Sequence, residues 1–228
     1  MSKVIADITM SLDGYVTGPG ADPQHGLGDA PEIHAWVSDQ DAVDTEILEG
    51  ATAASGAVVM GRRLFDTVDG PDGWSTEMGY GAQEAGTPPF FVVTHSPPRQ
   101  VRLEQELGMS VTFVSGLEAA IDQARAAAIE GDVVIMGGGD VIGQALEQGI
   151  VDEFHVHLAP LVLGGGTLLF RAGTRQRFRQ RDVRPSVNAV HIIYERVTDQ
   201  EVRRPATNDL TALDRSAQDS GICSNRRS

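Results

Sequence analysis

The sequence predicts one α/β domain with a mostly parallel central sheet, antiparallel C-terminal strands and helices on both faces. Three observations support this prediction. Short apolar runs alternate with helical patterns from residue 3 to about residue 148. One of these runs, at 133–136, leads directly into three glycines and a further helix. After residue 150 the apolar runs continue without a helical pattern between them, which is typical of antiparallel strands.

The first half of the chain is expected to supply three strands, two helices and two long loops. The first strand breaks at Ser11-Leu12-Asp13-Gly14, and a loop rich in glycine, proline and aspartate follows it to about residue 31. The second loop covers residues 69–89. In chain order the elements are a strand at 4–10, a helix at 41–54, a strand at 57–60, a helix at 62–68 and a strand at 90–94.

The second half is expected to supply two more strands with their helices, and then two strands that close the sheet. Ser115 and Glu118 have the spacing of a capping box at the start of the first helix. Asp140 is placed to cap the second helix, and Gly149 to end it. In chain order the elements are a strand at 111–114, a helix at 117–130, a strand at 133–136, a helix at 141–148 and strands at 153–163 and 189–197.

The composition excludes several classes of protein. The formal net charge of −14 opposes binding to nucleic acid or to an anionic membrane. Cys223 is the only cysteine, so no internal disulfide can form, and a reducing compartment is expected. The apolar runs are shorter than the roughly 20 residues that span a bilayer, and no charged-then-apolar leader begins the chain. A soluble cytoplasmic protein is expected.

The last part of the chain differs from the rest. Apolar periodicity is lost from Thr198, and residues 199–228 are rich in polar and charged side chains. Such a composition buries too little surface to fold. We therefore predict a folded domain over residues 1–198 and a disordered C-terminal tail over residues 199–228.

The glycine run is the clearest candidate for a binding site. Gly137, Gly138 and Gly139 let an anion approach the backbone, and a helix that begins near Val141 directs free N–H groups and its positive dipole end towards that anion. Ile142 stands where a Rossmann loop has its third glycine, and no Gly-Lys-Ser/Thr of a Walker loop follows. The pattern therefore indicates a phosphate site, with a tight turn that binds nothing as the alternative.

Five segments in chain order carry a resemblance to a known family. Together they resemble the dihydrofolate reductase fold, and in particular the C-terminal reductase domain of the bacterial riboflavin-biosynthesis deaminase-reductase, RibD. The resemblance covers about residues 3 to 197. The segments are 5–14 with its Met-Ser-Leu-Asp-Gly ending, 58–65 with Met-Gly-Arg, the strand end 91–94, the glycine run 134–139 and the late strand 152–166.

The resemblance implies that the chain binds NADPH. Arg62 and Arg63 would hold the ribose 2′-phosphate through bidentate contacts, which favours NADPH over NADH. Thr94 would lie by the adenosine half, and the backbone of Ala6 would border the nicotinamide amide. An exposed helix start that binds nothing is the alternative for the two arginines. The implied cofactor residues are Ala6, Gly61, Arg62, Arg63, Thr94, Gly137, Gly138, Gly139, Asp140 and Val141.

The proton donor is the least defined part of the predicted site. Asp13, just after the first strand, is our leading candidate, and its alternative role is that of a turn aspartate bonded to its own backbone. Trp36 would line the substrate side or belong to the core. Folate reductases carry a carboxylate on the helix after the first strand. Five acids crowd that region without one clear equivalent: Glu32, Asp39, Asp41, Asp44 and Glu46.

Two further patterns have a simpler alternative. His155 and His157 share one face of a strand, but a third ligand at suitable spacing is missing, so no metal is expected. Four alternating arginines could meet a phosphorylated substrate, although a solvated edge strand is the preferred interpretation. These arginines are Arg175, Arg177, Arg179 and Arg181.

The predicted function is NADPH-dependent hydride transfer to a carbonyl or imine of a small pyrimidine or pterin-like substrate. It would resemble the activity of 5-amino-6-(5-phosphoribosylamino)uracil reductase. The zinc signature of the deaminase is absent, so the chain is not the bifunctional enzyme. The alternatives are a non-catalytic nucleotide-binding protein on the same fold and a dihydrofolate or pterin reductase. The family also implies a homodimer, and no nucleic-acid or membrane partner is expected.

Overall fold

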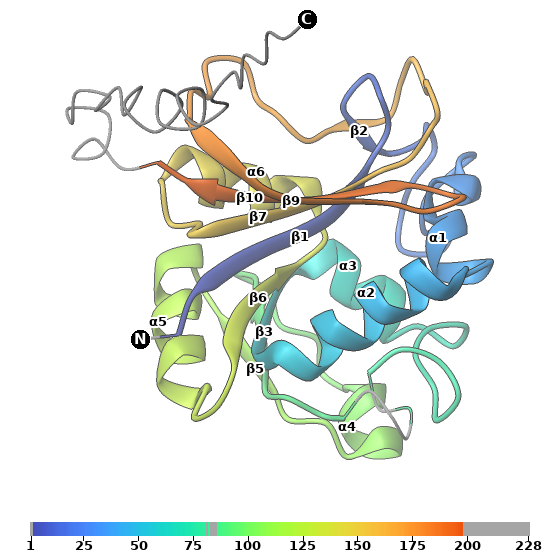
Figure 1. Cartoon of the computed structure of the whole chain (residues 1–228). Helices are drawn as coiled ribbons and strands as arrows, with labels where there is room; N and C mark the ends of the chain where they lie inside the picture. The colour runs from blue at the N-terminus through green and yellow to red at the C-terminus, as the bar shows by residue number, and fades with distance from the viewer. Residues whose placement is uncertain (1, 81, 83–85, 198–228) are drawn as a thin grey trace, which may run out of the picture. The chain divides into compact units, whose positions relative to one another are not determined.

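The computed structural model describes residues 2–80, 82 and 86–197, and the predicted tail at 199–228 lies outside them. One eight-stranded sheet has the order β5-β4-β3-β6-β1-β7-β10-β9 (Figure 1). All pairs from β5 to β7 are parallel, whereas β10 pairs antiparallel with both β7 and β9. The predicted fold class is therefore confirmed. The described residues up to Arg196 form one compact unit.

The bounds of the elements are as follows. The strands are β1 Val4–Met10, β2 Tyr15–Thr17, β3 Ser55–Gly61, β4 Phe90–Val93, β5 Val111–Val114, β6 Asp132–Met136, β7 Glu153–Leu158, β8 Thr167–Leu168, β9 Phe178–Pro185 and β10 Val190–Arg196. The helices are the 3-10 helix η1 Pro31–His34, and α1 Ala35–Ser38, α2 Ala42–Ala54, α3 Arg62–Val68, α4 Arg102–Leu107, α5 Leu117–Ala127 and α6 Gly139–Glu147.

The core lies on both faces of the sheet. On one face Val4, Ala6 and Ile8 of β1 belong to a cluster with the apolar side chains of α5 and α6. On the other face β3 and β4 pack against α3 through a second cluster that includes Phe65 and Phe90. Central parallel strands are buried on both faces, which is why their sequences are continuously apolar. Among the described residues no helix is long and apolar enough to cross a membrane.

Two predicted helix caps are wrong. Helix α5 has Gly116 as its N-cap, with φ 125° and no side-chain cap, so Ser115 lies outside the helix. Helix α6 begins earlier than predicted, with Gly138 as N-cap, and Asp140 is its second residue. In both cases a glycine makes the turn into the helix with a positive φ, and the polar side chain loses the capping position. Gly149 follows α6 with φ 65°, as a helix-terminating glycine should.

Several boundaries and short elements also differ from the predictions. β7 ends at Leu158 rather than at residue 163, and α5 ends at Ala127 rather than at residue 130. η1, α1, α4 and the small sheet of β2 with β8 were not predicted. These elements are two to six residues long, too short for hydrophobic periodicity to reveal. β9 is the edge strand of the sheet, as the alternating arginines indicated.

Candidate functional site

The candidate site lies at one edge of the sheet, where the parallel strands end. β3 ends at Gly61, β4 ends just before Thr94, and β6 leads into Gly137. The end of β3 contacts the start of α6, because a Cβ at Gly61 would lie 2.8 Å from Cγ2 of Val141. The carboxyl edge of a parallel sheet is the usual place for a ligand in α/β proteins. The structure thus brings together Gly61, the three glycines and Val141.

The three glycines have different environments. Gly137 and Gly138 have φ of 54° and 77°, and a Cβ at Gly138 would meet nothing within 4 Å. Gly138 caps α6 without a side-chain hydrogen bond, so no side chain competes for the first N–H groups of the helix. Gly139 is buried instead, where a Cβ would lie 2.9 Å from Val16. Gly138 therefore has room for an anion, whereas a Cβ at Gly137 would lie 3.0 Å from Leu64 Cδ2, and Gly139 serves close packing against β2.

Asp140 carries a negative charge at the start of α6, but an arginine offsets it. Arg171 Nη2 donates to Asp140 Oδ1 at 2.9 Å, and its Nη1 lies 3.9 Å from Glu147. The Asp140 side chain is 73% exposed. Its carboxylate is turned to solvent and to Arg171, which reduces its repulsion of an anion at Gly138.

The two arginines of α3 are not equivalent. Arg62 donates from Nε to Asp66 at 2.7 Å and from Nη1 to the Ser96 carbonyl. Ser96 in turn donates its N–H to Thr94 Oγ1 at 3.1 Å. Arg62 and Thr94 thus join the ends of β3 and β4. Arg63 is exposed, and within the described chain no hydrogen bond or ion pair holds its guanidinium.

Asp13 has a structural position. Its carboxylate accepts from Ser11 Oγ at 2.7 Å, from Leu163 N at 3.1 Å and from Gly164 N at 2.7 Å. The Ser11 and Gly164 hydrogen bonds, in that order, lower the pKa of Asp13 to about 2. A carboxyl with that pKa is ionised near neutral pH and bonded on both oxygens. Its contacts tie the end of β1 to the loop after β7, which gives Asp13 a structural role.

A carboxylate that the sequence analysis missed lies beside the glycine loop. Asp7 is on β1, one residue after Ala6, which is buried between β6 and β7. The carbonyl of Asp7 accepts the Gly137 N–H at 3.2 Å, so the backbone of Asp7 is bonded directly to the glycine loop. An acid inside the apolar run 4–10 was the signal that could have identified it.

Asp7 is the first of four side chains linked by hydrogen bonds, which we call the Asp7–Asp44 chain. His157 Nε2 lies 3.1 Å from Asp7 Oδ1, and His157 Nδ1 lies 2.7 Å from His191 Nδ1. His191 Nε2 lies 2.8 Å from Oδ1 of Asp44, which is fully buried. β1, β7, β10 and α2 each contribute one member. Of the five acids considered on sequence, Asp44 is the one that the fold buries.

Trp36 covers this chain. Its ring lies 4.1 Å from the ring of His157, centroid to centroid, and its Nε1 donates to Thr9 Oγ1 at 2.8 Å. Trp36 is buried, so it is not an open wall for a substrate. The indole shields the two histidines from water, and its face favours a positive charge on His157.

Hydrogen bonding keeps both carboxyl groups ionised despite burial. Burial raises the pKa of Asp7, but the charge and hydrogen bond of His157 outweigh it and leave the pKa below its usual value. Burial also raises the pKa of Asp44, and hydrogen bonds from Ser186, the Asp41 backbone and His191 again leave it lowered.

Two histidines in the same region resist protonation. Burial lowers the pKa of His191, and the hydrogen bond to Asp44 opposes this effect only in part. The pKa of His34, on η1, is lowered to about 4 by removal from water and by the charge of His157, while Asp7 raises it. Neutral histidines thus lie beside the ionised carboxylates.

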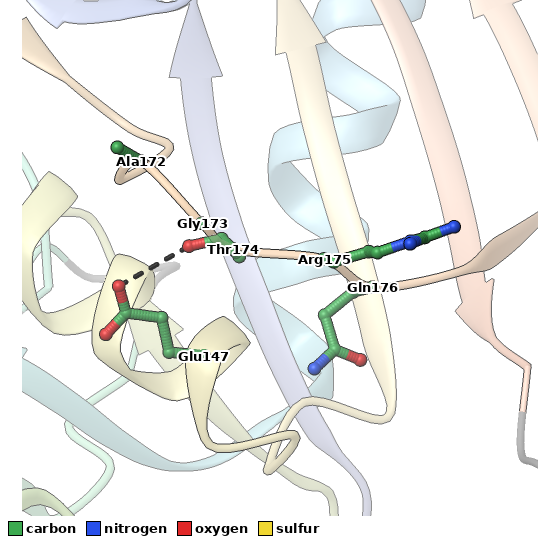
Figure 2. A pocket seen from close by; sticks show the side chains of 6 residues that line it. All are labelled: Glu147, Ala172, Gly173, Thr174, Arg175 and Gln176. Atoms are coloured by element: carbon green, nitrogen blue, oxygen red, sulfur yellow. Dashed lines mark hydrogen bonds between the residues drawn. The ribbon is translucent and has the colours of Figure 1, made fainter.

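The remaining predicted features fall elsewhere. Arg181 pairs with Glu153 of β7 at 2.5 Å and Arg179 with Glu195 of β10 at 2.8 Å, so these arginines of β9 bind acids of the same sheet. In the described part of the chain no three His, Cys, Asp or Glu side chains are placed to hold a metal ion. The hollow in Figure 2, lined by Glu147 and residues 172–176, lies by the end of α6 opposite to the glycine loop.

Comparisons with known proteins identify the family and the fold of the chain. The model of the RibD C-terminal domain matches residues 2–192. YyaP of Bacillus subtilis (strain 168) is 23% identical over 198 residues, which cover 84% of this chain and 94% of YyaP. A putative riboflavin biosynthesis protein from Shewanella sp. PV-4 has a TM-score of 0.60 at 21% identity, covering 87% of this chain and all of that one.

Two further solved structures relate the fold to enzymes. Acinetobacter baumannii RibD has a TM-score of 0.58 at 16% identity, and the match covers 87% of this chain and 59% of that one. Dihydrofolate reductase from Enterococcus faecalis, complexed with NADP(H), has a TM-score of 0.53 at 16% identity, covering 86% and 97% of the two chains. At such identities the likeness shows a dihydrofolate reductase-like fold. From the family match over residues 2–192, the chain belongs to the RibD C-terminal domain family.

Proposed function

We propose that the protein is an NADPH-dependent reductase that transfers a hydride to a C=N or C=O group of a small pyrimidine or pterin-like substrate. One observation supports this most strongly. The glycine loop, which is open at Gly138 and precedes an uncapped helix, is joined to β1 by a backbone hydrogen bond from Gly137 to Asp7. Asp7 itself carries a partly exposed carboxylate. A phosphate-binding element and an acid thus lie at the same edge of the sheet. Hydride transfer needs little more than that from a protein.

The residues present fit a dinucleotide. Gly138 leaves space for a pyrophosphate at the N-terminus of α6. Arg63, the second residue of α3, is exposed and its guanidinium has no partner among the described residues, whereas Arg62 holds Asp66 and Ser96. We therefore assign the 2′-phosphate to Arg63 and a positioning role to Arg62. When bound, the cofactor would supply the hydride.

The substrate class comes from the family. The solved structure of a Thermotoga maritima deaminase and 5-amino-6-(5-phosphoribosylamino)uracil reductase is 12% identical, with a TM-score of 0.56 and 57% of that chain covered. A substrate with a pyrimidine-type ring and a reducible C=N or C=O group follows by analogy. The expected homodimer remains a prediction, which light scattering on the purified protein tests.

Binding of the cofactor is tested by calorimetric titration with NADPH and with NADH. Arg63→Ala should weaken NADPH binding about tenfold or more and leave NADH binding unchanged, because only NADPH carries the 2′-phosphate. Arg125→Ala is the matched control, since Arg125 lies at the far end of α5 and contacts Asp152. Equal effects of Arg63→Ala on both nucleotides would contradict the phosphate assignment, and no binding of either would contradict the proposed function.

A further inference from the structure

The Asp7–Asp44 chain holds a fixed number of protons. It has three contacts, from Asp7 to His157, from His157 to His191 and from His191 to Asp44, of 3.1, 2.7 and 2.8 Å. A contact of that length between two nitrogens, or between nitrogen and oxygen, requires one hydrogen between the two atoms. Two neutral imidazoles and two carboxylates carry two hydrogens. The three contacts therefore require one additional proton.

The arrangement of the protons follows from the contacts. Asp44 is ionised and accepts the Nε2–H of His191, which leaves the Nδ1 of a neutral His191 as an acceptor. His157 then donates from Nδ1 to His191 and from Nε2 to Asp7, which makes His157 the imidazolium. The face of Trp36, 4.1 Å away, stabilises that charge.

Only one end of the chain is open to solvent. The Asp44 side chain is 0% exposed and those of both histidines are almost fully buried, whereas the Asp7 side chain is 19% exposed. Asp7 Oδ1 faces His157, and Oδ2 makes no hydrogen bond within the described residues, with His155 Nδ1 4.0 Å away. The extra proton can therefore enter and leave through Asp7 alone. The backbone bond from Gly137 puts this open end beside the glycine loop.

We propose that Asp7 delivers the proton of the reduction to the substrate, and that His157, His191 and Asp44 store it behind Asp7. This inference rests on the proposed function, and it names the acid that the function requires. Asp7 is then the catalytic residue. The other three are positioning residues, since they act only through Asp7.

The proposed reduction needs one hydride and one proton. Reduction of a C=N or C=O group adds to its carbon a hydride, supplied by the reduced nicotinamide that is thereby oxidised, and adds a proton to its nitrogen or oxygen. That proton leaves His157 Nε2, passes through the Asp7 carboxyl and forms the new N–H or O–H bond. His157 becomes a neutral imidazole, and solvent restores the proton through Asp7 after the product leaves.

Other ionisable groups around the chain set the pH at which the proton is held. Three of these groups lie on strands of the chain's members or next to them: Glu153 and His155 of β7, and Arg184 of β9. Two more interact electrostatically with Asp7, namely His34 of η1 and Tyr80. The ionisable groups on the segments around the chain are Lys3, His34, Asp41, Glu46, Tyr80, Glu153, His155, Asp182 and Arg184.

The stored proton is tested by nitrogen NMR of the histidine rings in the free protein, without cofactor or substrate. Near neutral pH the wild type should show both ring nitrogens of His157 protonated and only Nε2 of His191 protonated. Asp7→Asn should leave only two protons on the two rings under the same conditions, because it removes the negative charge that opposes the imidazolium. A wild-type spectrum in which the two rings share only two protons would overturn the proposal.

Delivery of the proton is tested by steady-state kinetics with a compound that the wild type reduces. Asp7→Asn should lower kcat about 100-fold or more while the NADPH dissociation constant stays within about twofold. His157→Gln keeps a donor towards Asp7 but cannot take up and release a proton, so it should lower kcat and remove the alkaline limb of the pH profile. Glu49→Gln, at an exposed position on the same helix as Asp44, is the control and should match the wild type.

The outcomes separate this proposal from the proposed function. If Asp7→Asn keeps kcat within about threefold of a catalytically active wild type, Asp7 is not the donor and the inference fails while the reductase stands. If the wild type binds no NADPH, the proposed function fails, and with it the delivery of the proton to a substrate.

Discussion

The two halves of the sheet differ in what they bury. The half made of β3 and β4 is covered by α3 and α4 with an apolar cluster, which includes Met60, Phe65 and Phe90. The half made of β1, β7 and β10 presents Asp7, Thr9, His157 and His191 on one face, because the register aligns Thr9 with His157 and His157 with His191. We call the half made of β3 and β4 the dry half, because apolar side chains cover it, and the half made of β1, β7 and β10 the polar half.

This difference teaches how the fold combines stability with chemistry. Apolar burial stabilises the dry half, which holds the ends of β3 and β4 in place. Buried ionisable groups stabilise a fold far less, since hydrogen bonding offsets little more than the loss of hydration. We infer that the polar half is kept for its chemistry, and mutations in the two halves should act differently.

The largest effect is expected in the dry half. Phe90→Ala should lower the free energy of unfolding by about 4 kcal/mol, since Phe90 is 2% exposed and its ring meets those of Trp74 and Tyr80. Urea denaturation measures this loss. Phe170→Ala, at a side chain 44% exposed, should cost less than about 1 kcal/mol. Equal losses would mean that the cluster is not the main source of stability.

In the polar half, removing a hydrogen-bonding side chain should cost more stability than removing only its charge. Asp44→Ala should lower the free energy of unfolding by about 3 kcal/mol, because the His191 Nε2–H and the Asp41 N–H lose their acceptor. Asp44→Asn keeps an acceptor for His191 and should cost only about 1 kcal/mol. The same denaturation series measures both, and a larger loss in the Asn variant would contradict the hydrogen-bonded description.

The polar half should also make stability depend on pH. The pKa of His34 is about 4 in the folded chain, below the value near 6.5 of an unfolded histidine, so the unfolded state binds more protons between these values. The free energy of unfolding should therefore fall by roughly 2 kcal/mol as the pH drops through this window, and His191 should add to the loss. Denaturation as a function of pH measures it. His34→Phe should flatten the profile between these values, and an unchanged slope would contradict the assignment.

The smallest effect separates two adjacent glycines. Gly139→Ala should cost about 1 to 2 kcal/mol of stability, because its Cβ would lie 2.9 Å from Val16 and 3.3 Å from Thr167. Gly138→Ala enters open space at φ 77°, so it should cost about 1 kcal/mol and mainly weaken NADPH binding. Thermal denaturation and nucleotide titration on both variants give the comparison. If Gly139→Ala impaired binding more than Gly138→Ala, the roles of the two would be reversed.

The sequence was sufficient for what depends on periodicity. The alternation of apolar and helical runs predicted the parallel sheet, and the absence of a helix between residues 163 and 189 predicted the antiparallel end. The glycines at 137 and 138 were recognised because a residue without a Cβ lets an anion approach the backbone just before a helix. These features are local, so neighbouring residues reveal them.

The Asp7–Asp44 chain could not be predicted because it is not local. Asp44 and His191 are 147 residues apart, and Asp7 and His157 are 150 apart. Strand register and the position of α2 bring them together. Asp13 drew attention instead because it lies within a recognisable motif, although its hydrogen bonds to Leu163 and Gly164 give it a structural role.

The most direct test of the reductase account follows NADPH oxidation by the wild-type protein with a panel of pyrimidine and pterin-like compounds that carry a C=N or C=O group. The account predicts that at least one compound is reduced in equal amount to the NADPH consumed, and that Asp7→Asn binds NADPH but loses this turnover. Tight NADPH binding with no reduction of any compound in the panel would contradict it and would favour a nucleotide-binding protein without catalysis.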